Sequence, residues 1–367
     1  MIIIENLQHY LKNMYFYNID TPMMKSRLIP YMLLYFPLSS FGQEVNEFDS
    51  KKYQEEDKNK ISLVTGISYI NNSFGLLSEH QTFLLKPNDS FYTEFFLRYR
   101  WLDASISFAP KLIRINNDDD RKGKTKYLNL GFAFFLTPKL RQFVSYNQIK
   151  GLYLESTKEF FYTFLDGLDF GTISDDYLIF PDAKYRSFKG ETSYLWMGNK
   201  ESYRSYTNMT YKPLKNDFVM ITGLFYQYNI MKDTDRLIYK GQELNDGSTK
   251  EPPTKDLRMA IRSGVGIQRV IKNNWYAIVE LYPQVNYSKL IGENYHEFNF
   301  GLNSNARVGY DNGKWFFGGG AQVNWVNNSN ENFYSTTQWQ FRMGVGMRIN
   351  SPKFVSRNFD KIDQILK

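Results

Sequence analysis

Hydrophobic and polar residues alternate along much of the chain, most regularly between Thr337 and Asn350. Every second residue from Trp339 to Ile349 is large and apolar, and the residues between them are Gln, Arg or Gly. A period of two predicts a β-strand whose two faces meet unlike surroundings. The apolar face requires a protein core or a lipid bilayer, and the polar face requires water or hydrogen-bonding partners.

The same alternation recurs through most of the sequence, most clearly in its second half. Many of these segments are longer than the five or six residues common in soluble sheets, and they suit strands that cross a bilayer obliquely. Thirteen strand candidates cover residues 61–70, 91–99, 102–114, 126–136, 139–155, 188–197, 202–213, 216–231, 257–271, 274–290, 295–311, 314–326 and 336–349.

The connections between these candidates come in two sizes. Short turns at one rim and long loops at the other are typical of outer-membrane barrels. We therefore predict an all-β fold, a single antiparallel up-and-down transmembrane β-barrel of about 12–14 strands. The short turns are Thr137-Pro138, 198–200, 272–274 and 311–313, and the long loops are 71–90, 115–125, 156–187, 232–256 and 327–335.

This assignment of rims fails at one connection. Counted back from the C-terminus, the long loop at 156–187 falls at the rim of the short turns. Two chain ends on the periplasmic side also require an even number of strands. Either a strand between 150 and 187 is missing from the set, or one candidate segment is not a membrane strand.

A soluble sheet protein, with its apolar face inward, would show the same alternation. Three features favour lipid outside: an export signal, aromatic residues near strand ends, and polar faces rich in Asn, Gln, Gly and both signs of charge. Trp101, Trp275 and Trp315 are examples of the aromatic residues. Lysine, the usual exposed residue of a soluble sheet, is nearly absent from the polar faces of the clearest strands.

The export signal lies near the start of the chain. Basic residues at 24–27, an apolar run at 28–38 and a small-residue end before Gln43 form the three-part layout of a signal peptide. Prolines within the apolar run argue against a buried helix. The predicted organisation is an upstream extension plus signal peptide (1–42, cleaved between Gly42 and Gln43), a charged periplasmic lead-in (43–60), the barrel (61–350) and a C-terminal tail (351–367).

Composition narrows the function classes further. The chain has 367 residues, a formal net charge of +7 and no cysteine, which excludes disulfides, thiolate chemistry and a lipidated cysteine anchor. Its basic residues are scattered among acidic ones, whereas nucleic-acid binders concentrate them on one face. We therefore expect no nucleic-acid partner.

Candidate catalytic chemistry is sparse. His80 and His296 lie near predicted outer loops, and either could act as base in a serine hydrolase if a serine lay within hydrogen-bond reach. No spacing marks a nucleophile, and an exposed loop histidine is the simpler interpretation. Asp118–Asp120 lacks the ligand spacing of a calcium loop. We expect no enzymatic activity, no metal and no cofactor.

One set of polar residues on the inward faces of the strands forms a coherent constellation. The simpler interpretation is an ion-pair network that fills a narrow barrel, and the functional one is a cationic constriction that favours anionic solutes. The lumen-facing candidates are Arg258, Arg262, Glu280, Arg307, Arg342 and Arg348.

Several short motifs, in this order, resemble a family of uncharacterised gram-negative outer-membrane-type barrel proteins, catalogued as a domain of unknown function. The resemblance covers residues 60 to 350 and implies a signal-bearing barrel with no established activity. The motifs are Lys86-Pro87-Asn88, Tyr99 to Leu102 with Ser107-Phe108, Tyr146 to Leu154, Phe180-Pro181-Asp182, and Tyr194 to Asn199 followed by Ser202-Tyr203-Arg204.

The leading hypothesis is an outer-membrane β-barrel that is structural or forms a narrow pore with a partly cationic lumen. Its partners would be the lipid bilayer of the outer membrane and the barrel-assembly machinery, and the sequence leaves its oligomeric state open. One alternative is an outer-membrane lipid-modifying hydrolase that uses His296 or His80. Another is a soluble periplasmic β-barrel that binds an apolar ligand inside.

Overall fold

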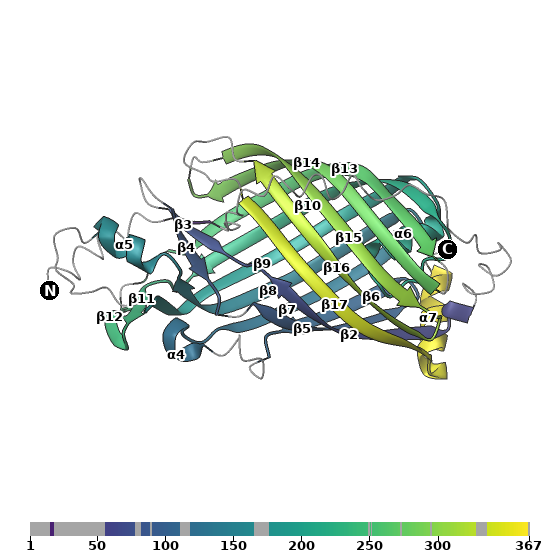
Figure 1. Ribbon diagram of the computed structural model, residues 1–367, viewed down its shortest axis with the longest axis horizontal. Helices are drawn as coiled ribbons and strands as arrows, with labels where there is room; N and C mark the ends of the chain where they lie inside the picture. The colour runs from purple at the N-terminus through teal and green to yellow at the C-terminus, as the bar shows by residue number, and fades with distance from the viewer. Residues whose placement is uncertain are drawn as a thin grey trace.

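The protein folds around one closed antiparallel β-barrel (Figure 1). A computed structural model describes residues 15–17, 56–77, 82–88, 90–110, 118–164, 176–248, 250, 252–271, 274–293, 296–327 and 336–365. Twelve strands in this part of the chain form the ring, which confirms the predicted fold class. They are β2 (Lys60–Ile70), β5 (Phe91–Tyr99), β6 (Leu102–Phe108), β7 (Lys126–Thr137), β8 (Leu140–Leu154), β9 (Leu178–Met197), β10 (Asp217–Lys232), β13 (Thr254–Ile271), β14 (Trp275–Ile291), β15 (His296–Asp311), β16 (Trp315–Asn327) and β17 (Thr336–Asn350).

The last strand closes the ring by pairing with the first. β17 pairs with β2 in antiparallel register, from Gln340 opposite Ile70 to Asn350 opposite Lys60. Each of the other barrel strands pairs with two neighbours in the same way. The ring therefore leaves no barrel strand with an open edge, as a structure that spans lipid requires.

The two ends of the barrel carry different additional elements. The long-loop end, on the left of Figure 1, holds two small hairpins and two helices, and the short-turn end, on the right, holds α6 and α7. Apart from 15–17, the predicted upstream extension and signal peptide lie outside the described residues. The additional elements are β1 (Tyr15–Tyr17), β3 (Phe74–Leu77), β4 (Thr82–Lys86), α4 (Asp119–Lys122), α5 (Thr157–Phe164), α6 (Lys200–Thr207), β11 (Arg236–Tyr239), β12 (Gln242–Asp246) and α7 (Lys353–Ile365).

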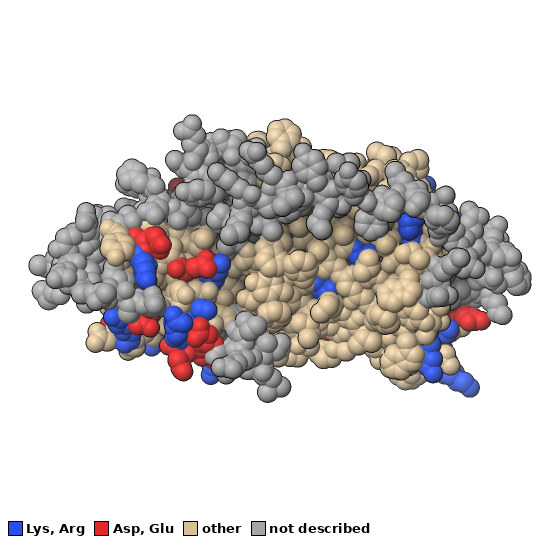
Figure 2. Space-filling model, viewed as in Figure 1, with Lys and Arg blue, Asp and Glu red and all other residues tan. Residues whose placement is uncertain are grey.

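The barrel is apolar outside and polar inside. Phe300 and Met343 are 71% and 68% exposed on the outer face, whereas Gln268 and Arg348 are buried inside. On the face in Figure 2, charged residues gather at the two ends, and the surface between them carries only isolated basic patches. This distribution is that of a transmembrane barrel. It is the reverse of a soluble barrel with an apolar interior.

None of the helices in the described part of the chain is long and apolar enough to cross a bilayer.

The structure corrects one predicted strand and resolves the mismatch between the rims. Residues 202–213 are not a strand: α6 occupies their first half, and the rest is irregular. The predicted short turn at 198–200 is therefore wrong. Removing that strand leaves twelve, and the loop at 156–187 then falls at the long-loop end. β9 begins at Leu178, ten residues earlier than predicted.

The C-terminal tail forms a helix that is fastened to the short-turn end. α7 (Lys353–Ile365) lies against the turn between β5 and β6. The Arg100 guanidinium contacts the carboxylates of Asp360 and Asp363, each at 2.6 Å. The Trp101 indole N–H donates to Asp363 at 2.8 Å. The last strand thus continues into an element that is tied to the second and third strands of the barrel.

The arrangement of faces predicts that the effect of a new charge on β17 depends on the face that carries it. Met343→Arg places a cation on the lipid-facing side, which should lower the unfolding free energy by about 2–4 kcal/mol. Gln340→Arg, three residues earlier on the lumen side, should lower it much less. Urea unfolding in lipid vesicles, followed by tryptophan fluorescence, measures both. Equal losses for the two variants would contradict the assignment of faces.

Candidate functional site

The segment between β9 and β10, residues 198–216, folds into the short-turn end of the barrel. We call this segment the plug. Its helix, α6, begins at Lys200 and follows Asn199, whose side-chain oxygen accepts a hydrogen bond from the Glu201 backbone N–H at 2.9 Å. This is a standard N-cap for a helix. Tyr203 and Tyr206 are three residues apart, so both lie on the buried face of the helix.

Side chains from several strands hold the plug in place. The Tyr203 hydroxyl donates to Ser193 Oγ on β9 at 2.8 Å. Ser205 is hydrogen-bonded to Gln268 on β13. Asn208 Nδ2 donates to Asp103 Oδ2 on β6 at 3.1 Å. The plug is thus bonded to widely separated parts of the barrel wall.

Two of the predicted lumen arginines bind the plug backbone. Arg307 Nη2 donates to the carbonyl oxygens of Ser205 and Tyr206, at 2.8 and 3.1 Å. These carbonyls lie near the C-terminal end of α6, where a cation is favourable. Arg348 Nη2 donates to the carbonyl of Thr210 at 2.9 Å. Arg307 therefore satisfies carbonyls that the short helix leaves unpaired, and Arg348 satisfies a carbonyl of the irregular segment that follows it.

Two glycines of the wall make room for plug side chains. A Cβ atom on Gly266 of β13 would lie 2.5 Å from the ring of Tyr206. On Gly344 of β17 it would lie 3.2 Å from the sulfur of Met209. The inner surface of the barrel is therefore shaped to the plug as well as bonded to it.

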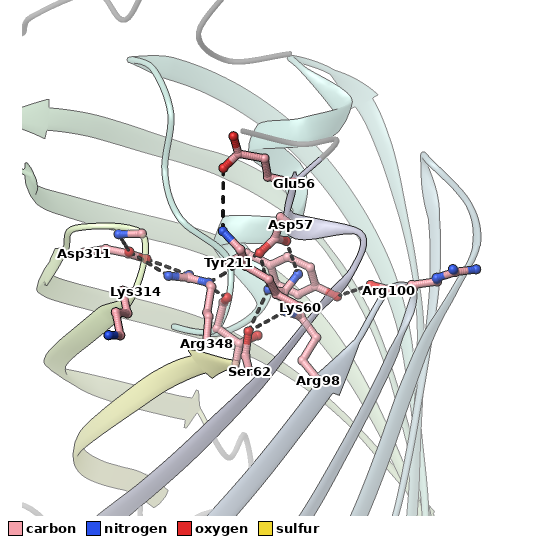
Figure 3. Close-up of polar contacts among 12 residues, drawn as sticks. Glu56, Asp57, Lys60, Ser62, Arg98, Arg100, Tyr211, Asp311, Lys314 and Arg348 are labelled. Carbon is pink, nitrogen blue, oxygen red and sulfur yellow. Dashed lines mark hydrogen bonds and ion pairs between the residues drawn. The ribbon is translucent and has the colours of Figure 1, made fainter. Parts of the chain in front are cut away.

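A buried ionic cluster joins the plug to both ends of the barrel sequence (Figure 3). Asp57, just before β2, is paired with Arg98 at 2.5 and 2.9 Å and lies 3.5 Å from Arg348 Nε. Arg348 is also paired with Asp311 at 2.7 Å. The Arg98 guanidinium lies over the ring of Tyr211, 4.5 Å from its centroid. Asp57 thus links the lead-in to the plug through two arginines.

The electrostatics of this cluster favour an ionised Asp57. Burial disfavours its charged form, but Arg98, and then Arg348 and Lys60, outweigh burial and hold the pKa of Asp57 below its ordinary value. Its carboxylate therefore contributes stability at neutral pH.

The remaining predicted lumen residues also face the interior, each with a partner there. Arg342 Nε lies 2.9 Å from Glu94, and Arg258 Nε lies 3.0 Å from Asp256. Arg262 is paired with Glu191. Glu280 accepts hydrogen bonds from Tyr282 at 2.7 Å and Asn305 at 2.5 Å. Their role in function remains a prediction, but this pairing favours the ion-pair network over a cationic constriction.

A polar cavity of about 550 Å³ lies in the lumen, with plug residues as part of its lining. The basic residues along it are Arg141, Lys189, Arg258, Arg262 and Arg342, and the acidic residues are Glu94, Asp103, Glu191, Glu280 and Glu297. The cavity lining therefore contains equal numbers of basic and acidic side chains. Among the described residues, no group of three or more His, Asp or Glu could hold a metal ion.

Of the two candidate catalytic histidines, His296 is described by the structure and does not line this cavity. His296 is the first residue of β15 and is exposed. His80 lies outside the described residues. Sequence reasoning did not identify Asp57, Arg98, Asp311 and the plug, because Asp57 stands in a run of charges and the plug was assigned to a strand. The helical spacing of Tyr203 and Tyr206 was the available signal.

A closed barrel with an apolar exterior and a polar, plugged lumen defines an outer-membrane-type β-barrel protein. The chain belongs to the family described as Domain of unknown function (DUF4421), whose model matches residues 47–348. The resemblance that the sequence motifs indicated is thus confirmed. No curated protein matches the chain.

The chain also has low similarity to several solved structures. The translocator domain of autotransporter NalP from Neisseria meningitidis is 10% identical, with 83% of this chain and 95% of that chain covered and a TM-score of 0.42. The beta domain of the Bordetella autotransporter BrkA is 8% identical, with coverage of 79% and 100% and a TM-score of 0.37. LpxR from Salmonella typhimurium is 8% identical, with coverage of 77% and 99% and a TM-score of 0.31. Similarity at this level carries no information on function.

The Asp57 cluster predicts a pH-dependent loss of stability. Asp57→Asn should lower the unfolding free energy by about 3 kcal/mol at pH 7, because Arg98 then lacks its carboxylate partner. The folded-state pKa of Asp57 is depressed, so its contribution is present above the unfolded-state pKa of about 3.9 and disappears as pH falls through the lower folded value. The gap between wild type and variant should therefore shrink in acid.

Urea unfolding at pH 7 and at acidic pH measures this gap. Asp120→Asn, at an exposed position in α4, is the matched control and should leave stability unchanged at both pH values. A gap of the same size at both pH values would show that the Asp57 charge is not the stabilising feature.

Proposed function

We propose that the protein is an outer-membrane β-barrel that keeps its lumen closed with the plug, so that solutes pass only when the plug moves. The observation that carries this proposal is the binding of plug carbonyls by Arg307 and Arg348. Hydrogen bonds to charged donors are among the stronger ones in proteins, about 1.5–3 kcal/mol each. A segment held in this way forms a stable closure.

The charges of the lumen also support a closed resting state. A permanently open selective pore would present a ring of charge of one sign at its constriction. Here Arg262 and Arg342 are paired with acidic residues of other strands. The partly cationic lumen of the sequence hypothesis is thus neutralised, and its arginines act by holding the barrel and plug together.

The orientation and location are part of the proposal. The chain ends of the barrel, the short turns and the plug share one end, which in an outer-membrane barrel faces the periplasm. The long-loop end then faces outward. Insertion of such a barrel would depend on the barrel-assembly machinery. The single histidine of β15 adds no specific support for the hydrolase alternative.

Conductance in planar lipid bilayers tests the closure. Wild-type protein should show almost no steady current. A variant in which residues 201–212 are replaced by a short Gly–Ser linker should conduct continuously, because the lumen loses its obstruction. Arg307→Ala should show intermittent openings, because two plug carbonyls lose their donor. Arg357→Ala, exposed on α7, is the matched arginine control and should behave as wild type.

Two results would contradict the proposed closure. One is steady current through the wild type equal to that of the linker variant. The other is a folded linker variant, verified by circular dichroism, that remains closed.

Cell fractionation tests the location separately. The full chain should be recovered in the outer-membrane fraction and released only by detergent, because its outer face is apolar. Met343→Arg should reduce that recovery, since the lipid-facing charge hinders insertion. Recovery of the wild type in the soluble periplasmic pool would overturn the membrane location.

A further inference from the structure

The cavity above the plug has one wall in which carboxamide side chains are the most common type. Four consecutive strands, β14 to β17, supply them, and all line the cavity. We call this surface the amide wall. It consists of Gln284, Asn286, Asn299, Asn303, Asn305, Gln322, Asn324, Gln338 and Gln340.

The strand register sets these amides in continuous rows. Asn303 stands opposite Asn324, which stands opposite Gln338 on the next strand. The neighbouring row runs from Asn305 through Gln322 to Gln340 in the same way. Directly opposed residues have Cβ atoms about 4.5–5.5 Å apart. The rows therefore present hydrogen-bonding groups at short, regular intervals along and across the wall.

Carboxamides complement hydroxyl groups, since each supplies both donors and acceptors and carries no charge. Some of this capacity is not used within the protein. Asn299 is 6% exposed, and its side-chain oxygen has no hydrogen-bond partner among the described residues. The side-chain oxygen of Asn147, on β8, is also without one in that part of the chain. Both residues line the cavity.

The balance of charge in the cavity argues for a neutral ligand. The five basic and five acidic lining residues leave no net formal charge to favour an ion of either sign. The ring of Phe143 on β8 also lines the cavity and offers a surface on which the C–H face of a sugar ring can pack. The volume, about 550 Å³, lies within the ~300–1,000 Å³ range of small-ligand sites.

We infer that the amide wall is a binding site for an uncharged, polyhydroxylated ligand of the oligosaccharide class. This inference rests on the proposed closure, since the plug turns the lumen into a pocket that can retain a ligand. The amide rows bind the hydroxyl groups, and the paired charges around them hold the wall in shape.

Isothermal titration calorimetry of the detergent-solubilised full chain tests the inference. The probes are three neutral trisaccharides (maltotriose, cellotriose and triacetylchitotriose) and the anionic trigalacturonic acid. At least one neutral probe should bind. The double variant Asn303→Ala/Gln322→Ala should weaken that binding about tenfold or more, because two hydrogen-bonding amides are lost. Both side chains face the lumen cavity, so the fold should tolerate the change.

Gln242→Ala, at an exposed position in β12 outside the barrel lumen, is the matched amide control and should bind as wild type does. Absence of binding by all three neutral probes up to roughly 10 mM would overturn the inference. Equal binding by the folded double variant, or tighter binding of trigalacturonic acid than of every neutral probe, would also overturn it.

The bilayer measurement separates the two possible failures. A wild type that stays closed yet binds no neutral trisaccharide leaves the closure intact and refutes the amide-wall site alone. A wild type that conducts steadily refutes the closure, whatever the calorimetry gives.

Discussion

The pairing of β17 with β2 is the interaction on which the rest of the structure depends. Lipid offers no hydrogen bonds, so a strand with an unpaired edge in a bilayer would carry a large energetic penalty at every residue. The seam from Gln340–Ile70 to Asn350–Lys60 removes that edge. Once the ring is closed, alternate side chains face lipid or lumen, and polar groups that lipid excludes collect inside.

The polar interior of the barrel explains how the irregular backbone of the plug can be accommodated there. Irregular backbone is tolerated at membrane depth only where protein or water satisfies it. The carbonyls of Ser205 and Tyr206 accept hydrogen bonds from Arg307, and the carbonyl of Thr210 accepts one from Arg348. These arginines are in turn placed by the barrel strands. Arg348 therefore belongs both to the contacts of the plug and to the ionic cluster around Asp57.

Much of the barrel could be predicted from sequence because each strand face meets a uniform environment. Phe341 and Met343 alternate with Gln338, Gln340 and Arg342, and the structure places the first set outside and the second inside. The fold class, the approximate strand number and the inward direction of the arginines could all be predicted from that regularity.

The plug could not be predicted in the same way, because non-local contacts decide its conformation. From the sequence, residues 202–213 are predicted as one of thirteen strands. The helix forms there because its buried face meets Ser193, Gln268 and the space left by Gly266. None of these partners is close in sequence. The same limit applies to Asp57, whose burial depends on Arg98 and Arg348.

The Asp57–Arg98–Arg348 cluster also constrains the order of folding. Asp57 precedes the first barrel strand, whereas Arg348 lies near the end of the last one. Contacts between distant parts of a chain form late, because the intervening loop entropy must be overcome first. The complete cluster can therefore form only when β17 pairs with β2. At that stage Arg348 also becomes available to donate to the Thr210 carbonyl of the plug. A barrel whose seam is still open lacks the contact between Arg348 and the Thr210 carbonyl, so closure of the barrel wall and completion of the plug contacts coincide late in folding.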